Sequence, residues 1–338
     1  MKVFNLDMHS SVIADLRYIF EREGHEVVNW SLSGHTWIFG KGRDNVKIIT
    51  QDTWNKLDMK MIDDFCAEYY DFLSSFDAFI VAFPISFALI FERFKKPIFA
   101  LNCIRYETPF FQSHDNPMLK ELHSCLLRLQ GSGLLHVIAN NKVDFDYFKL
   151  GNPQIDVKLI PSLCSYTQMN WKGLHNNRFL VYTNEQIVPN NPLIIKRSQI
   201  GNFNWDSLMT FRGIIHIPYE STTMSIFEHV TSKIPLFFPT KRFLKELWAS
   251  RSATCICDYW KGNIPPYLEE TRSYNFWIDR ADYYGIDGYY YFDSISELFT
   301  MLANFKDELL EIRTKFVDSR KQKILDDWHT ELESIRLT

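Results

Sequence analysis

Short apolar runs alternate with amphipathic stretches along the first half of the chain. Runs at 2–7, 26–32, 78–83, 97–104, 134–139 and 157–164 have the length and composition of buried strands. Stretches at 9–24, 59–75, 85–94 and 117–130 repeat their apolar residues at helical spacing. Strands that alternate with helices favour a parallel sheet with helices on both faces. The pattern therefore predicts an α/β domain over residues 1–165.

A polar, turn-rich segment at 165–177 reads as an interdomain linker, and the alternation then resumes. Strands are expected at 179–183, 193–195, 214–217, 234–238 and 253–257, and helices at 241–249 and 295–304. These elements predict a second α/β domain over 178–305. The chain closes with one long charged helix, 306–338 in our division. The predicted fold class is therefore α/β, with two Rossmann-like domains in series.

Residues 214–239 combine a strand, a hydroxyl cluster, a helix and a second strand. Ser221, Thr222 and Thr223 precede the helix, where a hydroxyl can cap free N–H groups or the N–H groups can hold an anion such as a diphosphate. Glu220 lies before the helix and Glu228 within it. One carboxylate could face the reacting end of a ligand while the other reaches ribose hydroxyls. Simple capping explains the hydroxyl cluster equally well.

This segment resembles the donor-nucleotide segment of GT-B glycosyltransferases, on Pro218, Glu220, Ser221 to Met224, Glu228 and Ile234-Pro235-Leu236. The resemblance implies two Rossmann-like domains that face each other across a cleft, with the final helix packing back across both. It also implies a nucleotide-sugar donor, with Glu228 on the ribose, Ser221 to Thr223 at the diphosphate and Glu220 near the donor sugar. Lys196 and Arg197 follow a strand and could add positive charge to the diphosphate grip, or they form a solvated basic pair.

The first domain offers candidates for acid–base catalysis at the carboxyl ends of its strands, where open α/β sheets bind ligands. Asp7 and His9 follow the first strand, although His9 is equally well explained as a plain helix-start residue. The segment around Ile104-Arg105 and Pro109-Phe110 is similar to one in some inverting GT-B enzymes, including phage DNA glucosyltransferases. Those enzymes carry an acidic base where this chain has Cys103, so Glu107 is the substitute candidate. The alternative is a surface Glu107 paired with Arg105.

Several common cofactor and metal motifs do not occur in the sequence. No G-x-G-x-x-G follows the first strand and no P-loop motif occurs, which disfavours a dinucleotide enzyme and a P-loop NTPase. Asp144 and Asp146 form a D-x-D, but the preceding Asn141 indicates a capped helix start. Cys255 and Cys257 lack a second ligand pair and read as neighbouring strand positions. We therefore expect no metal and no cofactor, with the nucleotide sugar as substrate.

Composition narrows the class of partner. The 338 residues carry a formal charge of −4, which makes nucleic acid an unlikely partner class, although a modified-DNA acceptor stays open. Scattered cysteines, the absence of a signal-peptide pattern and the lack of a long apolar run lead us to expect a cytoplasmic protein without a membrane span.

The predicted function is transfer of a sugar from a nucleotide diphosphate to the hydroxyl of a glycan, glycoconjugate or other acceptor. We expect a metal-independent reaction. The spacing of Glu220 and Glu228 resembles that of retaining GT-B enzymes, whereas Asp7, His9 and Glu107 would suit the general base of an inverting enzyme. We favour inversion, because Lys196 and Arg197 are not where the retaining class places its Arg–Lys pair. Two alternatives remain open. One is a sugar-nucleotide epimerase of the two-Rossmann type, and the other is a non-enzymatic two-domain protein that binds a small ligand.

Overall fold

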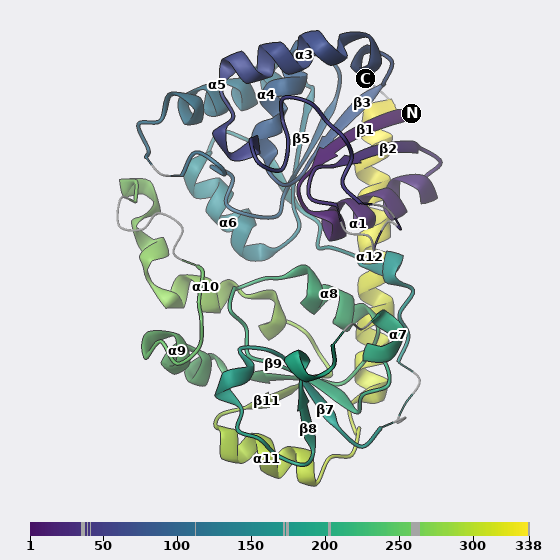
Figure 1. Cartoon of the computed structure of the whole chain (residues 1–338), viewed down its shortest axis with the longest axis vertical. Coiled ribbons are helices and arrows are strands. Elements are labelled where there is room, and N and C mark those ends of the chain that lie inside the picture. Colours follow the sequence, from purple (N-terminus) through teal and green to yellow (C-terminus); the bar gives the residue numbers. More distant parts are fainter. Residues whose placement is uncertain are drawn as a thin grey trace. The chain divides into compact units, whose positions relative to one another are not determined.

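The structure is a computed structural model of the whole chain, and it describes all residues except 35–37, 39, 41, 112, 172, 174, 175, 202, 203, 258–263, 337 and 338. The chain divides into two compact units. Unit 1 comprises Met1–Ser162, Tyr259–Glu269 and Leu325–Thr338, and unit 2 comprises Leu163–Asp258 and Glu270–Ile324. Each unit is built on its own parallel sheet (Figure 1).

The sheet of unit 1 has six parallel strands in the order β2-β1-β3-β4-β5-β6. The strands are β1 (Lys2–Asp7), β2 (Glu26–Ser31), β3 (Ala78–Val81), β4 (Ile98–Asn102), β5 (Leu135–Ala139) and β6 (Val157–Leu159). The helices are α1 (Ser10–Arg22), α3 (Met59–Ser74), α4 (Ala88–Phe91), α5 (Pro117–Gly131) and α6 (Lys142–Gly151). Every residue of β3 and β4 is buried, as expected for strands covered by helices on both faces.

The sheet of unit 2 has five parallel strands in the order β11-β10-β9-β7-β8. The strands are β7 (Phe179–Thr183), β8 (Ile194–Lys196), β9 (Gly213–His216), β10 (Leu236–Pro239) and β11 (Tyr290–Phe292). The helices are α7 (Trp205–Leu208), α8 (Met224–Thr231), α9 (Lys241–Ala249), α10 (Tyr274–Arg280) and α11 (Ile295–Ala303). Both sheets confirm the predicted α/β fold class.

The last helix, α12 (Leu310–Arg336), contributes to both units, and its long, charged character confirms the sequence prediction. In unit 1, Trp328 is buried and its ring lies 5.7 Å from that of Phe20. In unit 2, the Arg313 side chain is fully buried and donates to the carbonyl groups of Lys233 and Gly288. Each half of the helix is therefore fixed by contacts within its own unit.

Some expected elements differ from those observed. The strand expected at 253–257 is wrong, because this segment carries no ladder and is held by single bonds instead: Thr254 N donates to Asn184 Oδ1 (2.9 Å) and Ile256 N to the Tyr219 carbonyl (2.9 Å). The strand expected at 157–164 stops at Leu159. The helix expected at 85–94 is one turn of α-helix, α4, between two 3₁₀ turns.

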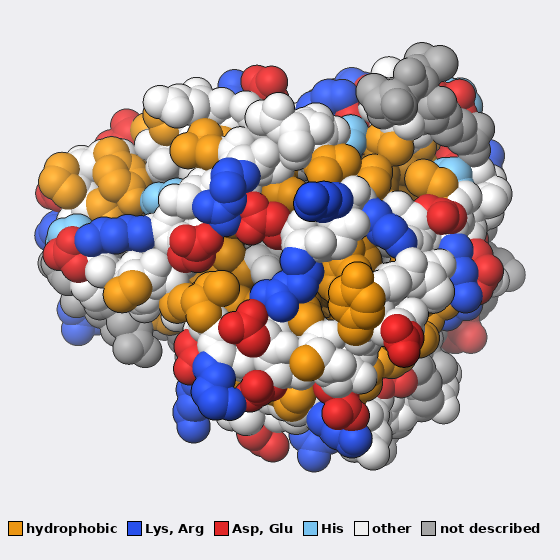
Figure 2. Space-filling view, turned by 90° about the horizontal axis from the view of Figure 1, so that it is seen from above, with side chains coloured by type: hydrophobic (Ala, Val, Ile, Leu, Met, Phe, Trp, Pro, Cys, Tyr) orange, Lys and Arg blue, Asp and Glu red, His pale blue; other side chains and the backbone are white. Residues whose placement is uncertain are grey.

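Acidic and basic side chains are interspersed over the molecular face that Figure 2 draws, with apolar side chains between them. Ion pairs occur on the helices of unit 1, such as Lys60 with Asp64 and Arg128 with Glu92.

Candidate functional site

The two sheets share one strand order, which locates a ligand-binding position in each unit. In each sheet, the strand that comes first in the chain lies between the second and the third strands. The chain therefore passes to one side of the first strand and then crosses over to its other side. Open α/β sheets bind ligands at this switch point, outside the carboxyl ends of the two strands. The switch point lies between β1 and β3 in unit 1 and between β7 and β9 in unit 2.

In unit 2, hydrogen bonds join the loop after β7 to the loop after β9. The Thr183 hydroxyl donates to the Ile217 carbonyl at 3.0 Å, and Asn184 Nδ2 donates to the same carbonyl at 3.0 Å. Asn184 adopts a left-handed conformation with φ of 47°, which asparagine tolerates better than most residues. These bonds fix the backbone that leads into Tyr219 and Glu220.

Glu220 turns its carboxylate back onto its own loop. Its Oε1 accepts from the backbone N of Ser221 (2.7 Å), the hydroxyl of Ser221 (3.0 Å) and the thiol of Cys257 (3.1 Å). Both Glu220 and Ser221 are buried. The Ser221 hydroxyl, expected near a diphosphate, therefore serves to hold Glu220 in this structure.

The helix expected after the hydroxyl cluster is α8, and Thr223 is its N-cap residue. The Thr223 side chain makes no capping hydrogen bond and instead lies 3.1 Å from the hydroxyl of Ser225. Side-chain capping by Thr223, the simple explanation of the cluster, is therefore wrong. Thr222 and Thr223 are half-buried at the positive end of the helix dipole, a position that favours an anion.

Glu228 lies on α8 within an aromatic cluster. The carboxylate is buried, and its Oε1 accepts a hydrogen bond from the hydroxyl of Tyr166. Tyr182, at the end of β7, is near enough that the Glu228 charge adds to burial in raising the pKa of Tyr182 to about 12. The guanidinium of Arg197 stacks over the Tyr182 ring, 5.2 Å from its centre.

The basic pair after β8 divides between two environments. Lys196 is half-buried and ends the strand, and its backbone N donates to Gln199 Oε1 at 2.8 Å. Arg197 is exposed and lies close to Tyr182 and to Tyr219, whose pKa it lowers against the larger effect of burial. The structure thus brings Arg197, Glu220 and Glu228 together around two tyrosines.

Two histidines pack beneath this cluster. His216 on β9 and His229 on α8 are buried, with His216 Nε2 2.9 Å from His229 Nδ1. The ring of Tyr182 packs edge-on against His229 at 4.8 Å. Burial lowers the pKa of His229 to about 3, and burial with the neighbouring His229 lowers the pKa of His216. Both rings are therefore neutral near pH 7.

In unit 1, Asp7 and His9 lie at the switch point. The Asp7 carboxyl group is fully buried and accepts from the backbone N of His9 and of Phe83, the latter at 3.2 Å. Burial raises the pKa of Asp7 to about 8, against the opposing effect of these two bonds. His9 is half-buried at the start of α1, and its ring centre lies 5.8 Å from that of Phe83. Asp7 thus holds the backbone that presents His9.

Glu107 is fully buried after β4, so the alternative of a surface Glu107 is wrong. Burial raises the pKa of Glu107 to about 8, against the smaller opposing effects of the Tyr147 and Tyr106 side chains and of Arg105. Arg105 Nη1 lies 3.3 Å from Asp144 Oδ1 in a buried ion pair. The backbone N of Asp144 donates to Asn141 Oδ1 at 2.8 Å, which confirms the capped helix start predicted for the D-x-D.

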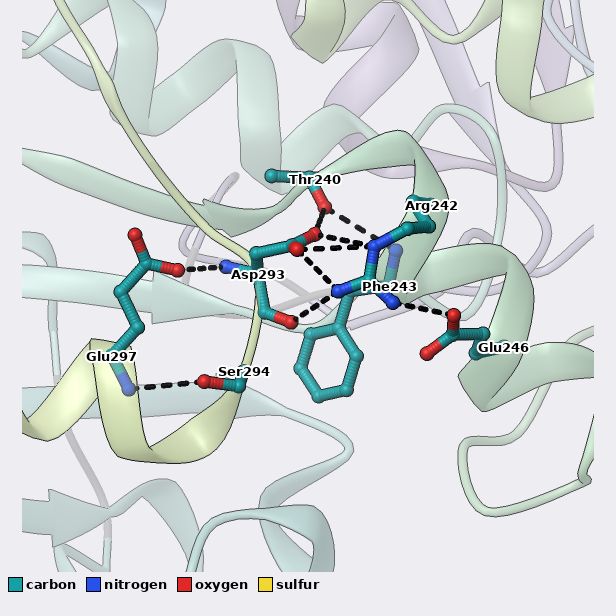
Figure 3. A network of polar contacts seen from close by, with 7 residues as sticks. All are labelled: Thr240, Arg242, Phe243, Glu246, Asp293, Ser294 and Glu297. Atoms are coloured by element: carbon teal, nitrogen blue, oxygen red, sulfur yellow. Dashed lines mark hydrogen bonds and ion pairs between the residues drawn. The ribbon is translucent and has the colours of Figure 1, made fainter.

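A charged network closes the neighbouring strand ends, those of β10 and β11 (Figure 3). Arg242 on α9 contacts both carboxylate oxygens of Asp293, and Nη1 of Arg242 lies 2.5 Å from Glu246 Oε1. Thr240 caps α9 and also donates to Asp293, while Ser294 caps α11. The side chains of this network hydrogen-bond to one another and join the starts of α9 and α11, so we assign no ligand to it.

The described residues offer neither a group of metal ligands nor a membrane-spanning helix. Among them, no three His, Cys, Asp or Glu side chains are grouped so that they could hold a metal ion. None of the helices in the same part of the chain is long and apolar enough to cross a membrane.

Comparison with known proteins yields structural matches alone, since no family model and no curated protein matches the chain. Spinosyn rhamnosyltransferase SpnG is similar with a TM-score of 0.47 at 10% identity, covering 98% of this chain and 100% of that one. Spinosyn forosaminyltransferase SpnP gives 0.45 at 10%, covering 100% of both chains. SnogD of Streptomyces nogalater gives 0.42 at 10%, covering 99% of both. All three are glycosyltransferases, the class that residues 214–239 resemble. The fold is assigned from the order of the parallel strands in the two sheets.

Sequence reasoning missed most of the aromatic side chains of the site. Tyr166 falls in the segment interpreted as a linker, and it packs against Trp205 with ring centres 5.5 Å apart. Tyr182 lies one residue before the end of a predicted strand, so the rule that ligands gather at strand ends could have singled it out. Cys257 is 37 residues from Glu220, and no local pattern connects the two.

Proposed function

We propose that the protein is a glycosyltransferase that moves a sugar from a nucleotide diphosphate to an acceptor hydroxyl. The observation that carries the proposal is the cluster at the switch point of unit 2, where Glu228, Tyr166, Tyr182 and Arg197 meet beside the start of α8. A carboxylate, aromatic surfaces and a cation at a helix N-terminus suit the ribose, base and diphosphate of one ligand.

In this proposal Glu228 accepts hydrogen bonds from the ribose hydroxyls while the Tyr166 hydroxyl keeps its carboxylate in place. The start of α8, with Thr222 and Thr223, and the side chains of Lys196 and Arg197 bind the diphosphate. Their positive charge stabilises the negative charge that grows on the diphosphate as it leaves. Glu220 remains the predicted neighbour of the donor sugar.

The reaction itself needs a proton acceptor. The acceptor hydroxyl would attack the anomeric carbon as its proton passes to a base, and the bond from that carbon to the diphosphate oxygen would break with its electron pair on the diphosphate. A single displacement of this kind inverts the anomeric centre. His9 suits the role of base because it is half-exposed, and Asp7 would act by positioning it. The catalytic role expected for Glu107 stays a prediction, as do independence from metal ions and the class of acceptor.

A thermal-shift panel of UDP, GDP, ADP, CDP and dTDP, each with and without EDTA, tests donor binding. A nucleotide at 100 times its Kd should stabilise the wild type by about 2.7 kcal/mol, which is several degrees for a protein of this size. Glu228→Gln should lose the response. Glu246→Gln, on α9 of the same unit and 57% exposed, is the matched control and should keep it. Failure of every nucleotide to stabilise the wild type would overturn the proposal.

Turnover then separates the transferase from its alternatives. With the sugar form of the nucleotide identified above, a transferase releases free nucleoside diphosphate faster once an acceptor is supplied. An epimerase would change the donor sugar without an acceptor. A binding protein would do neither.

A further inference from the structure

Unit 2 contains a hollow of about 500 Å³ near the amino end of β9. Trp171, Arg212, Phe305, Lys306 and Leu310 line it. Arg212 directly precedes β9, whereas the proposed donor site follows the carboxyl end of this strand. At a rise of about 3.3 Å per residue, four strand residues separate the two places by roughly 13 Å. The hollow, whose lining includes Leu310 at the start of α12, is therefore a separate site.

Two of its walls are fixed by hydrogen bonds. Trp171 donates from its indole Nε1 to the Phe211 carbonyl at 3.0 Å and from its backbone N to the Ser232 carbonyl at 2.8 Å. Arg212 Nη2 donates to the Phe305 carbonyl at 2.7 Å, and its guanidinium lies 5.4 Å from the centre of the Phe305 ring. Preorganised walls lower the entropy that a ligand loses on binding.

The lining carries an excess of positive charge. Asp307 is the one acidic residue among the described lining residues, and Arg313 neutralises this carboxylate with two contacts, at 2.6 and 3.1 Å. Among the described residues, Arg212 and Lys306 form no ion pair, and the Lys306 side chain is exposed. An apolar surface from Trp171, Phe305 and Leu310 thus lies beside two cations without counter-charges.

We propose that this hollow binds an organic anion with an apolar body, in the chemical class of aromatic carboxylates and sulfonates. The apolar body packs against Trp171, Phe305 and Leu310, and its anionic group lies near Lys306 and Arg212. The volume is within the range of about 300–1,000 Å³ that small-molecule pockets have. Two cations without counter-charges favour an anion over a neutral ligand, because association with an anion compensates their charge.

Fluorescence titration with 1-anilinonaphthalene-8-sulfonate tests the proposal on the whole chain, with the uncharged N-phenyl-1-naphthylamine as the matched probe. The sulfonate should bind saturably at one site, and the uncharged probe should bind about 10-fold more weakly, a difference of about 1.4 kcal/mol. Added salt should lower the affinity for the sulfonate and leave the affinity for the uncharged probe unchanged. Equal affinity of the two probes would overturn the proposal.

Two variants and a control locate the binding. Lys306→Glu reverses one charge of the lining, and Leu310→Asp places a charge in its apolar wall. Each variant should lower the affinity for the sulfonate by about 10-fold or more. Ile312→Asp is the control, since Ile312 lies on the same helix, is 50% exposed against 44% for Leu310, and does not line the hollow. Equal affinity in all three variants would overturn the proposal, and so would displacement of the probe by the nucleotide that binds the donor site. The thermal-shift panel is read independently, so either proposal can fail alone.

Discussion

The hydroxyl of Tyr166 donates a hydrogen bond to Oε1 of Glu228 and so ties the chain just after unit 1 to the helix of the proposed donor site. Tyr166 lies in a 3₁₀ turn, Ser165–Thr167. A second hydrogen bond joins the same segment to α8, from the Thr231 hydroxyl to the Leu163 carbonyl at 2.6 Å. A buried carboxylate needs such a donor to offset the loss of hydration. Tyr166 therefore fixes the carboxylate on which nucleotide binding would depend.

Tyr166→Phe should weaken binding of the nucleotide identified by thermal shift by about 10-fold, because hydrogen bonds to charged groups contribute roughly 1.5–3 kcal/mol. Isothermal titration calorimetry gives the affinity, and circular dichroism confirms that the fold is kept. Tyr70→Phe, at a residue 58% exposed on α3, is the control and should bind like the wild type. Unchanged affinity in Tyr166→Phe would show that the tyrosine does not position Glu228.

Arg197→Ala should weaken the binding of a nucleoside diphosphate by about 10-fold, because a guanidinium forms strong hydrogen bonds with phosphate oxygens. It should leave the affinity for the corresponding nucleoside monophosphate nearly unchanged. The two ligands are compared by calorimetry at one ionic strength. Arg178→Ala removes an exposed arginine just before β7, at the far end of the strand that contains Tyr182, and should change neither affinity. An equal loss for both ligands would place Arg197 at the base or ribose instead.

Local pattern was sufficient to predict most of the elements. The bounds of α9 are those that the sequence predicts, 241–249, and Asn141 caps α6 as expected. Both follow from helical periodicity and from side chains that bond the first N–H groups of their own helix. The parallel sheets follow in the same way, from alternation of apolar strands with amphipathic helices.

The polar bonds of the candidate site could not be predicted from such patterns. The Tyr166 hydroxyl bonds a carboxylate 62 residues away, and the segment around it is polar and turn-rich, as a linker would be. Ser221 reads as a cap or a phosphate ligand, yet its hydroxyl donates to the adjacent Glu220. The segment 253–257 has the composition of a strand, but its bonds go to Asn184 and Tyr219 in the site loops. These choices depend on tertiary packing, which overrides local propensity.

Glu107→Gln should change how the free energy of unfolding depends on pH. Burial raises the pKa of Glu107 from 4.5 to about 8. Between these values the folded chain holds a proton that the unfolded chain releases, so rising pH destabilises the wild type by up to about 1.4 kcal/mol per pH unit. This loss ends above the folded pKa, and a neutral glutamine does not contribute to it.

Urea unfolding at pH 5, 6, 7 and 8 measures the effect. Relative to the wild type, Glu107→Gln should gain stability steadily as the pH rises through this range. Asp7, whose pKa is raised in the same direction, is present in both proteins, so its contribution cancels in the difference. Glu26→Gln, at a side chain 65% exposed, is the control and should follow the wild type. Parallel curves for Glu107→Gln and wild type would contradict the prediction.

His229→Gln tests the buried histidine pair through the opposite pH dependence. The folded pKa of His229, about 3, lies below the value of 6.5 in the unfolded chain. Below pH 6.5 the unfolded chain therefore binds a proton at this residue and the folded chain does not. The free energy of unfolding falls as the pH falls, by up to about 1.4 kcal/mol per pH unit. Glutamine does not titrate, and its amide can still bond Nε2 of His216.

The variant should be less stable than the wild type at pH 7, by roughly 1–3 kcal/mol for a changed buried side chain, yet it should lose less stability between pH 6.5 and pH 5. The measurement is the difference in the free energy of unfolding between these two values. His114→Gln, at a side chain 43% exposed, is the control and should show the wild-type dependence. A decline in His229→Gln as steep as that of the wild type would mean that His229 is protonated in the folded protein, and that the neutral pair beneath Tyr182 does not exist in solution.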